Sequence, residues 1–494
     1  MGPSAAAFTL PSDRSVARRD GRSGRVADPR VGVLQIGSRP ADGDGVTLLP
    51  ALQRPGRLSV PELLRTGGVH CAYQPVVELA TGEVLGREAL LRTPEGSGWS
   101  SPLDVLHAAE ADGLLGELER AAMSRAIEDA AAASEGAPQT LFLNIEPRTL
   151  SRHLPLVLET LARREPQVRV VVEITERALA LDPAGMLDAA ARLRSVGCAI
   201  ALDDVGVVPA SLAFIPLLAP EIIKLDLQLL RTLEDPETMT VADAVRARAE
   251  ATGARVVAEG IETRDDLSRA VVLGADLGQG WYLGRPHRGL PRGERHAGRL
   301  PRPHAPLGGG ATPFEIVAPR RAVRTVPKRL LLPLSRTLEM SAAEHRVPPL
   351  VLGSFQDERF FTAHTARRYA RLAQALPFVG ALGSGRPATI PTGVRWAAVD
   401  PSEPLAREWA VVVLGAHESV ALVGREVAGP VGPAGADCGG SIATADDSEG
   451  AAEGTVPVED GGRDFEFAVT HDQGLVAEVA QALLRRFGAD ARPS

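Results

Sequence analysis

Two adjacent carboxylates, Asp203 and Asp204, follow the apolar run at residues 198–202. Two like charges a few ångströms apart repel each other unless a cation or a proton separates them, so the pair is a candidate metal site. An Asp-Asp pair after a strand is also typical of a solvated turn or a helix N-cap, and the pair alone favours that interpretation. Which interpretation holds, metal site or solvated turn, therefore depends on the polar residues that accompany the pair.

Polar side chains also stand at or near the ends of six other short apolar runs: Glu88, Asn144, Glu173, Lys224, Glu259 and Gln279. With a first strand at 70–79, the runs predict eight strands, at 70–79, 84–92, 140–146, 169–176, 198–204, 221–226, 255–262 and 275–284. The stretches between them, such as 117–133, 182–196 and 240–252, have apolar residues at helical spacing. This alternation predicts an α/β fold, a (β/α)8 TIM-type barrel. The C-terminal strand ends of such a barrel meet at one mouth, so we expect the polar side chains to gather there.

Residue usage singles out two of these side chains. Only Lys224 and Lys328 are lysines among 54 Lys and Arg residues, and Asn144 is the only asparagine. A chain that otherwise uses Arg places a Lys where a compact charge with a shiftable pKa is needed, and an Asn amide offers a neutral oxygen to a metal. We therefore expect both residues to serve the chemistry of the mouth.

Hard oxygen donors suited to Mg²⁺ or Mn²⁺ come from four of these residues: Glu88, Asn144, Glu173 and Asp203. Asp204 and Glu259 can complete a second ion site, with Asp203 bridging, and two such ions can clamp a phosphodiester and activate water. Lys224 can stabilise charge on the phosphate, and Glu259 can accept the proton of the attacking water. Phosphodiester hydrolysis is the reaction that this set favours, while polyphosphate and sugar-phosphate chemistry stay open.

Composition limits the other possibilities. The net charge is −8 and the pI is about 5.8, which argues against a nucleic-acid binder. Three dispersed cysteines (Cys71, Cys198 and Cys438) and no closely spaced His pair argue against thiolate zinc sites and disulfide frameworks. No run approaches eighteen apolar residues and no leader pattern is present, so we expect a reduced, cytoplasmic protein with no membrane partner.

The 494 residues are too many for one ordinary domain. Residues 1–57 are rich in Arg, Gly, Pro and Ser without periodicity, which predicts a disordered tail. We place the barrel at 58–287, a Pro-rich linker at 288–327 and a smaller α+β domain at 328–488. A Gly- and Asp-rich stretch at 428–462 predicts a disordered insertion in that second domain.

The ordered motifs of the first domain resemble those of EAL-domain cyclic di-GMP phosphodiesterases. They are REALLR at 87–92, NIE at 144–146, EITE at 173–176, DD at 203–204, KLD at 224–226, AEGIE at 258–262 and QG at 279–280. The resemblance implies a barrel whose first strand is antiparallel to the rest. It also implies hydrolysis of cyclic di-GMP to linear pGpG with Mg²⁺ or Mn²⁺.

The resemblance also assigns roles to individual residues. It implies metal ligands at Glu88, Asn144, Glu173, Asp203, Asp204 and Glu259. Glu259 matches the general base, with Lys224 and Gln279 around the attacking water, and Gln74 and Arg92 match substrate contacts. Glu176, Glu262 and Asp226 match residues that hold loops and neighbouring side chains in place.

One loop departs from the family pattern. The family has an aromatic residue followed by Gly-Thr-Gly-Tyr-Ser-Ser after the paired aspartates, whereas this chain has VGVVPAS at 205–211. The family loop supports the second metal and contributes to a homodimer interface. We therefore expect this loop to affect turnover and dimerisation, and an apolar surface at 205–210 is a candidate for the second domain to cover.

The second domain resembles the DICT sensory domain through LSRTLE at 334–339, FQ at 355–356, TARRY at 365–369, EW at 408–409 and THD at 470–472. This implies regulation of the barrel by an unknown sensory ligand or partner protein. The leading hypothesis is a regulated cyclic-guanylate phosphodiesterase. The alternative, which the altered loop motivates, is a catalytically weak or inactive effector that binds cyclic di-GMP.

Overall fold

The computed structural model of this chain describes residues 57–206, 209–296, 310–427 and 463–487. The expected N-terminal tail and the expected insertion at 428–462 lie outside the described residues. Part of the departing loop, residues 207–208, lies outside them too.

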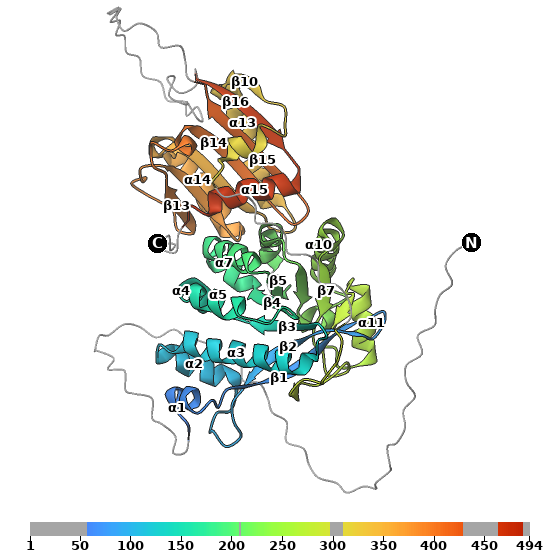
Figure 1. The fold of residues 1–494 in the computed structure, drawn as a ribbon. Coiled ribbons are helices and arrows are strands. Elements are labelled where there is room, and N and C mark those ends of the chain that lie inside the picture. The colour runs from blue at the N-terminus through green and yellow to red at the C-terminus, as the bar shows by residue number, and fades with distance from the viewer. Residues whose placement is uncertain (1–56, 207–208, 297–309, 428–462, 488–494) are drawn as a thin grey trace, which may run out of the picture. The chain divides into compact units, whose positions relative to one another are not determined.

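The first domain is a closed barrel of eight strands with the order β2-β3-β4-β5-β6-β7-β8-β1 (Figure 1). Strand β1 (His70–Glu78) is antiparallel to both of its neighbours in the barrel, and the other neighbouring pairs are parallel. This confirms the predicted TIM-type barrel and its antiparallel first strand. The other strands are β2 (Val84–Arg92), β3 (Gln139–Asn144), β4 (Val168–Thr175), β5 (Ala199–Val205), β6 (Ile222–Leu225), β7 (Arg255–Ala258) and β8 (Leu277–Gly278). A short strand, β9 (His287–Arg288), pairs with β1.

Helices connect the strands on the outside of the barrel (Figure 1). Their ends follow local sequence signals, as α10 (Pro236–Thr252) illustrates. The Asp235 side chain accepts the backbone N–H of Glu237, Pro236 occupies the first turn, and Gly253 ends the helix at φ +74°. The other helices are α1 (Val60–Arg65), α2 (Pro102–Ala111), α3 (Leu115–Ser134), α4 (Pro147–Arg152), α5 (Leu154–Ala162), α6 (Glu176–Leu181), α7 (Pro183–Ser195), η1 (Pro209–Phe214), α8 (Ile215–Leu218), α9 (Leu227–Arg231) and α11 (Arg264–Val272).

A compact apolar cluster fills the interior of the barrel, and every barrel strand contributes to it. Its members are Val76, Leu85, Phe142, Val171, Ala199, Ala201, Ile222, Val257 and Leu277, all of them buried. Gly86 makes room for this layer, because a Cβ at that position would lie 2.8 Å from the ring of Phe142. The interior is therefore a packed floor beneath the mouth and not a pore.

The second domain contains a sheet of seven strands with the order β10-β16-β15-β14-β11-β12-β13. Pairs β11–β12 and β12–β13 are parallel, and the remaining pairs are antiparallel. The strands are β10 (Arg324–Pro327), β11 (Leu350–Asp357), β12 (Val379–Ser384), β13 (Val394–Ala398), β14 (Glu408–Leu414), β15 (Ser419–Glu426) and β16 (Asp464–Thr470). The helices are α12 (Pro313–Val317), α13 (Lys328–Ser341), η2 (Ala342–Glu344), η3 (Glu358–Phe360), α14 (Ala363–Ala375), η4 (Pro404–Arg407) and α15 (Gln473–Leu484).

Helix α12 and strand β10 form in the range for which we expected only a linker. Helix α12 and strand β10 lie within residues 288–327, and β10 pairs with β16 over Arg324–Pro327. Their sequences are too short to show a period, so the pairing partner and not local pattern decides their structure. Strands β12 and β13 were likewise not predicted.

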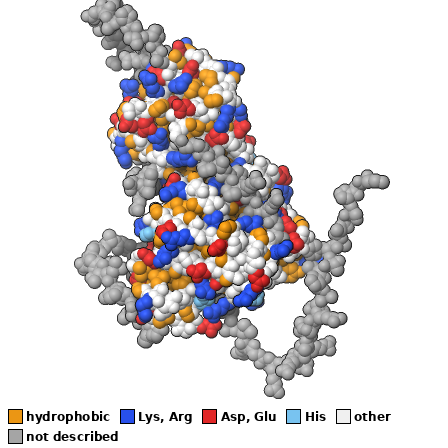
Figure 2. All heavy atoms as spheres, in the orientation of Figure 1, with side chains coloured by type: hydrophobic (Ala, Val, Ile, Leu, Met, Phe, Trp, Pro, Cys, Tyr) orange, Lys and Arg blue, Asp and Glu red, His pale blue; other side chains and the backbone are white. Residues whose placement is uncertain are grey.

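Charges of both signs are interspersed over the face of the molecule that Figure 2 shows, without a large basic field. This agrees with the net charge of −8. Among the residues that the structure describes, no helix combines the length and apolar character needed to cross a bilayer.

Candidate active site

The period of two along a strand brings the predicted polar residues to the mouth of the barrel. In six strands, the polar residue stands two positions after a member of the interior cluster, so both side chains take the inward face. The pairs are Phe142 with Asn144, Val171 with Glu173, Ala201 with Asp203, Ile222 with Lys224, Val257 with Glu259, and Leu277 with Gln279. The apolar residue forms the floor, and the polar residue faces the site above it.

Lys224 lies at the centre of this site and is fully buried. Its Nζ is 2.7 Å from Glu173 Oε1, 2.7 Å from Glu259 Oε1, 3.1 Å from Asp203 Oδ1 and 3.8 Å from Glu88 Oε2. Burial alone would lower the pKa of this ammonium, but the surrounding carboxylates outweigh it and raise the pKa well above the usual value. Lys224 therefore remains charged.

One ammonium cannot balance the carboxylates around it. Burial raises the pKa of Glu173 well above its usual value, with the charge of Glu88 adding to the effect. Burial likewise raises the pKa of Glu259 to about 8 and raises that of Asp204. In the metal-free protein, the excess negative charge is thus met by protons, which a bound cation would displace.

Amide groups hold Glu88 from two sides. Asn144 Nδ2 donates to Glu88 Oε1 at 2.5 Å, and Gln279 Nε2 donates to Glu88 Oε2 at 2.5 Å. Burial would raise the pKa of Glu88, but the Lys224 charge and these donors together lower it. Gln74, directly opposite Glu88 across β1 and β2, accepts from Gln279 Nε2 at 3.3 Å. The predicted metal ligand Glu88 is therefore ionised and fixed in orientation.

The donor set fits a hard divalent cation. Ligand oxygens of Asp203, Asp204 and Glu259 all lie within 4.8 Å of one another. The buried Glu173 Oε2 has no hydrogen-bond partner among the described residues, and the bond from Asn144 Nδ2 leaves its amide oxygen available. Asp204 has a φ of +58°, an uncommon and strained conformation for a residue other than glycine. Carboxylate and amide oxygens are the ligands that Mg²⁺ and Mn²⁺ prefer.

The predicted supporting residues differ in where the structure places them. Glu176 is buried and its Oε2 accepts the backbone N–H of Gly206 at 2.9 Å, which anchors the start of the departing loop. Asp226 caps α9 by accepting the N–H of Gln228 at 2.7 Å. Glu262, in contrast, is exposed, and its Oε2 lies 3.9 Å from Arg231. The structure therefore brings Glu176 into support of the site and leaves Glu262 on the surface.

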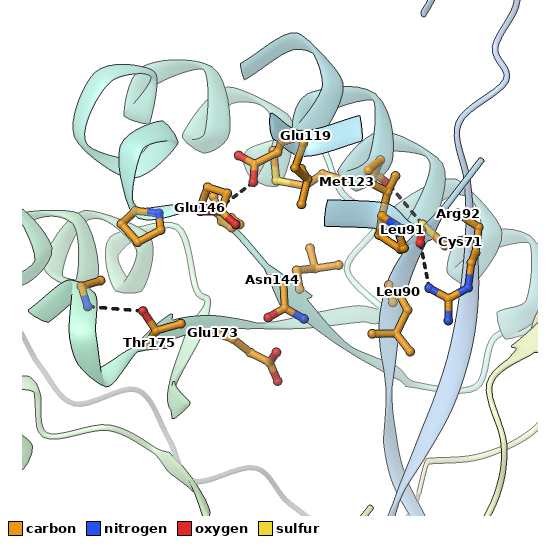
Figure 3. A pocket seen from close by; sticks show the side chains of 18 of the residues that line it. Cys71, Leu90, Leu91, Arg92, Glu119, Met123, Asn144, Glu146, Glu173 and Thr175 are labelled. Atoms are coloured by element: carbon orange, nitrogen blue, oxygen red, sulfur yellow. Dashed lines mark hydrogen bonds between the residues drawn. The ribbon is translucent and has the colours of Figure 1, made fainter. Parts of the chain in front are cut away.

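A cavity of about 410 Å³ adjoins the site between β2, β3, β4 and helices α2 and α3 (Figure 3). Arg92 lines it, as do the predicted ligands Asn144 and Glu173. Sequence reasoning missed Glu119, a buried carboxyl of α3 that also lines the cavity and accepts the N–H of Glu146 at 2.7 Å. Burial raises the pKa of Glu119 to about 7. The sequence feature that could have revealed Glu119 is its position on the apolar face of α3, four residues before the buried Met123.

Comparisons with known proteins agree with this architecture. The family model described as "EAL domain" matches residues 57–286, and the one described as "Sensory domain in DIguanylate Cyclases and Two-component system", the DICT domain, matches residues 316–427.

Several relatives carry names that bear on function, among them RocR and PdeB. "Cyclic di-GMP phosphodiesterase RocR" of Pseudomonas aeruginosa is 31% identical over 237 residues, covering 46% of this chain and 60% of RocR. "Probable cyclic di-GMP phosphodiesterase PdeB" of Escherichia coli K12 is 32% identical over 219 residues, covering 43% of this chain and 42% of PdeB. The chain thus spans less than two thirds of either relative.

Among solved structures, the PaMucR phosphodiesterase in complex with c-di-GMP has 25% sequence identity and a TM-score of 0.42. The match covers 46% of this chain and 96% of that chain. The two family matches, together with the closed barrel and the following sheet, identify the architecture. The chain therefore belongs to the proteins that combine an EAL domain with a DICT domain.

Proposed function

We propose that the barrel is a metal-dependent phosphodiesterase that hydrolyses cyclic di-GMP to linear pGpG. The observation that carries the proposal is the buried site in which Lys224 lies within 4 Å of four carboxylates at the mouth of an EAL barrel. The names of RocR and PdeB support the choice of substrate.

Two divalent ions, Mg²⁺ or Mn²⁺, complete the proposed site. The first ion would be held by four residues: Glu88, Asn144, Glu173 and Asp203. Asp204 and Glu259 would hold the second, with Asp203 shared between both. When bound, the ions supply positive charge that polarises the phosphodiester and makes a water acidic.

Lys224 and the side chains around it have separate roles in the proposed hydrolysis. Glu259, in its ionised form, accepts a proton from the attacking water, whose oxygen bonds to phosphorus while the P–O3′ bond breaks. The leaving O3′ takes up one proton and becomes the 3′ hydroxyl, and the phosphate stays on the 5′ oxygen. Lys224 Nζ stabilises the negative charge that develops on the phosphoryl oxygens. Gln279 keeps Glu88 in place, and Gln74 and Arg92 contact the substrate.

The test uses the purified full chain with cyclic di-GMP and Mn²⁺, followed by separation of the nucleotide products. The proposal expects pGpG from the wild type and none from Glu259→Gln. No turnover by wild-type protein that is folded by circular dichroism would reject it.

A second candidate function is a catalytically weak or inactive effector that binds cyclic di-GMP. The VGVVPAS sequence at 205–211 favours it, because Pro209 has no backbone N–H to donate and valine side chains carry no hydroxyl. Tight binding of cyclic di-GMP in EDTA without hydrolysis in Mn²⁺ would favour the effector over the enzyme. A homodimer, whose formation the altered loop would affect, and a cytoplasmic location remain predictions.

We further propose that the DICT domain regulates the barrel in response to a ligand or partner protein. Comparing kcat and KM of the full chain with those of a folded chain ending after Gly310 tests this. Regulation through placement of Asp204 and Glu259 would change kcat more than KM.

A further inference from the structure

A short segment that follows the barrel sequence returns to the outside of strands β2 and β3. We call residues 293–296 the strap. Its first residue, Gly293, donates its backbone N–H to Ala133 O at 2.9 Å at the end of α3. Glu294 and His296 make the contacts of the strap with β2 and β3.

Glu294 binds strand β2 through Arg87. Arg87 Nε and Nη2 donate to the two carboxylate oxygens of Glu294, each at 2.9 Å. The Arg87 side chain is buried, and the pair is therefore a bidentate, charge-assisted contact with little solvent competition. Burial would raise the pKa of Glu294, but the hydrogen bonds and charge of Arg87 lower it, so the carboxylate is ionised.

The same strap binds strand β3. Gln139 Nε2 donates to the backbone oxygen of Glu294 at 2.6 Å. The backbone N–H of Thr140 donates to His296 Nδ1 at 2.7 Å, and the His296 side chain is fully buried. The strap thus joins the outer sides of two neighbouring strands.

These two strands carry two predicted ligands of the first ion. Side chains alternate along a strand, so Arg87 faces outward to the strap while its neighbour Glu88 faces the site. Thr140 precedes Asn144 by four residues, roughly 13 Å along the strand. Inside the barrel, Asn144 and Glu88 are joined by a 2.5 Å hydrogen bond. The pair of ligands is therefore held from inside by this bond and from outside by the strap.

We propose that Arg87 and Glu294 are positioning residues for the metal site. Their ion pair fixes the backbone of β2 at Glu88, while the strap holds the start of β3 in register with it. The inference rests on the proposed metal function. It adds a residue, Glu294, that lies outside the matched EAL region and outside the predicted site set.

The test measures Mn²⁺ binding to the full chain, independently of catalysis, from the electron paramagnetic resonance signal of free Mn²⁺. Glu294→Gln removes the charge of the strap, and Arg87→Lys keeps a charge but loses the two-pronged contact. Loss of an outer partner of a metal ligand typically weakens metal affinity 10–100-fold, and we expect about tenfold here because Arg87 acts through the backbone. Activity with cyclic di-GMP should recover at higher Mn²⁺ concentration.

Two controls separate positioning from general destabilisation. Glu159→Gln on α5 removes an exposed ion pair with Arg163, the residue that follows the helix, and should leave Mn²⁺ affinity unchanged. The exchanged pair Arg87→Glu with Glu294→Arg should regain part of the lost affinity. If Glu294→Gln does not fold, Arg87→Lys decides the question.

The outcomes distinguish this inference from the proposed function. If the wild type binds Mn²⁺ and both folded variants bind it equally well, the positioning role is overturned while the phosphodiesterase proposal stands. If the wild type binds Mn²⁺ but does not hydrolyse cyclic di-GMP, the proposed activity fails and the positioning role is still decided by the binding data. Absence of Mn²⁺ binding by the wild type would overturn both.

Discussion

Replacing Lys224 by methionine removes the ammonium from the centre of the site and leaves its carboxylates without their counter-charge. Lys224 is 1% exposed and lies within 3.1 Å of Glu173, Asp203 and Glu259. Removing one partner from a buried ion pair costs about 3–5 kcal/mol. In a domain of this size, each kcal/mol of lost stability lowers the melting temperature by about 2–4 °C, so the melting temperature of Lys224→Met in EDTA should be roughly 6–20 °C below that of the wild type. The loss should grow with pH, as more of the carboxylates ionise.

Divalent metal should reverse this loss, because an ion supplies positive charge to the same carboxylates. Mn²⁺ at a hundred times its dissociation constant stabilises a protein by about 2.7 kcal/mol through one site. Removing the competing ammonium also strengthens metal binding, so Mn²⁺ should raise the melting temperature of Lys224→Met more than that of the wild type. Turnover should be lost in both conditions.

The other lysine of the chain provides the matched control. Lys328 is also buried, but in the second domain, with its Nζ 4.2 Å from the ring centre of Phe360. Lys328→Met should lower the melting temperature without any extra recovery in Mn²⁺. Two results would show that Lys224 is not the counter-charge of these carboxylates: a melting temperature of Lys224→Met equal to that of the wild type in EDTA, or a rise in Mn²⁺ no larger than that of Lys328→Met.

Three further predictions concern the same site. Burial raises the pKa of Glu259 from 4.5 to about 8, so the native metal-free protein binds more protons than the unfolded chain between these values, and its stability should fall as pH rises through that window. Mn²⁺ binding below about pH 8 should therefore release protons. Isothermal titration calorimetry in two buffers of different ionisation enthalpy detects this release, and equal binding heats in the two buffers would contradict the prediction. Glu259→Gln should abolish turnover while fluorescence titration still detects cyclic di-GMP binding, and unchanged turnover would exclude it as the base. Glu176→Ala frees the Gly206 N–H and should lower kcat at least tenfold, whereas exposed Glu262→Ala should stay within about twofold; the reverse order would contradict these placements.

Much of the barrel could be predicted because two simple periodicities determine it. In six strands, an apolar residue belongs to the packed floor of the barrel and the polar residue two positions later faces the site, as with Phe142 and Asn144 or Ile222 and Lys224. What the pattern could not supply is contact between segments distant in the sequence. Neither the central position of Lys224 nor the strap contact between Arg87 and Glu294 follows from local spacing.

The second domain shows the same limit more strongly. Strand β12 (Val379–Ser384) contains two glycines, and β13 (Val394–Ala398) contains a buried Trp396. Both are short, and they form because β12 pairs in parallel with β11 and β13 pairs in parallel with β12. In the barrel, Glu262 is the opposite case. Its motif at 258–262 resembles that of the family, but the structure places its side chain on the surface.

The most direct measurement is the conversion of cyclic di-GMP by the purified full chain in Mn²⁺, with the wild type and Glu259→Gln assayed side by side. We expect the wild type to yield pGpG, EDTA to stop the reaction, and Glu259→Gln to yield no product. Folded wild-type protein that binds cyclic di-GMP but leaves it intact in Mn²⁺ would contradict the proposed phosphodiesterase activity.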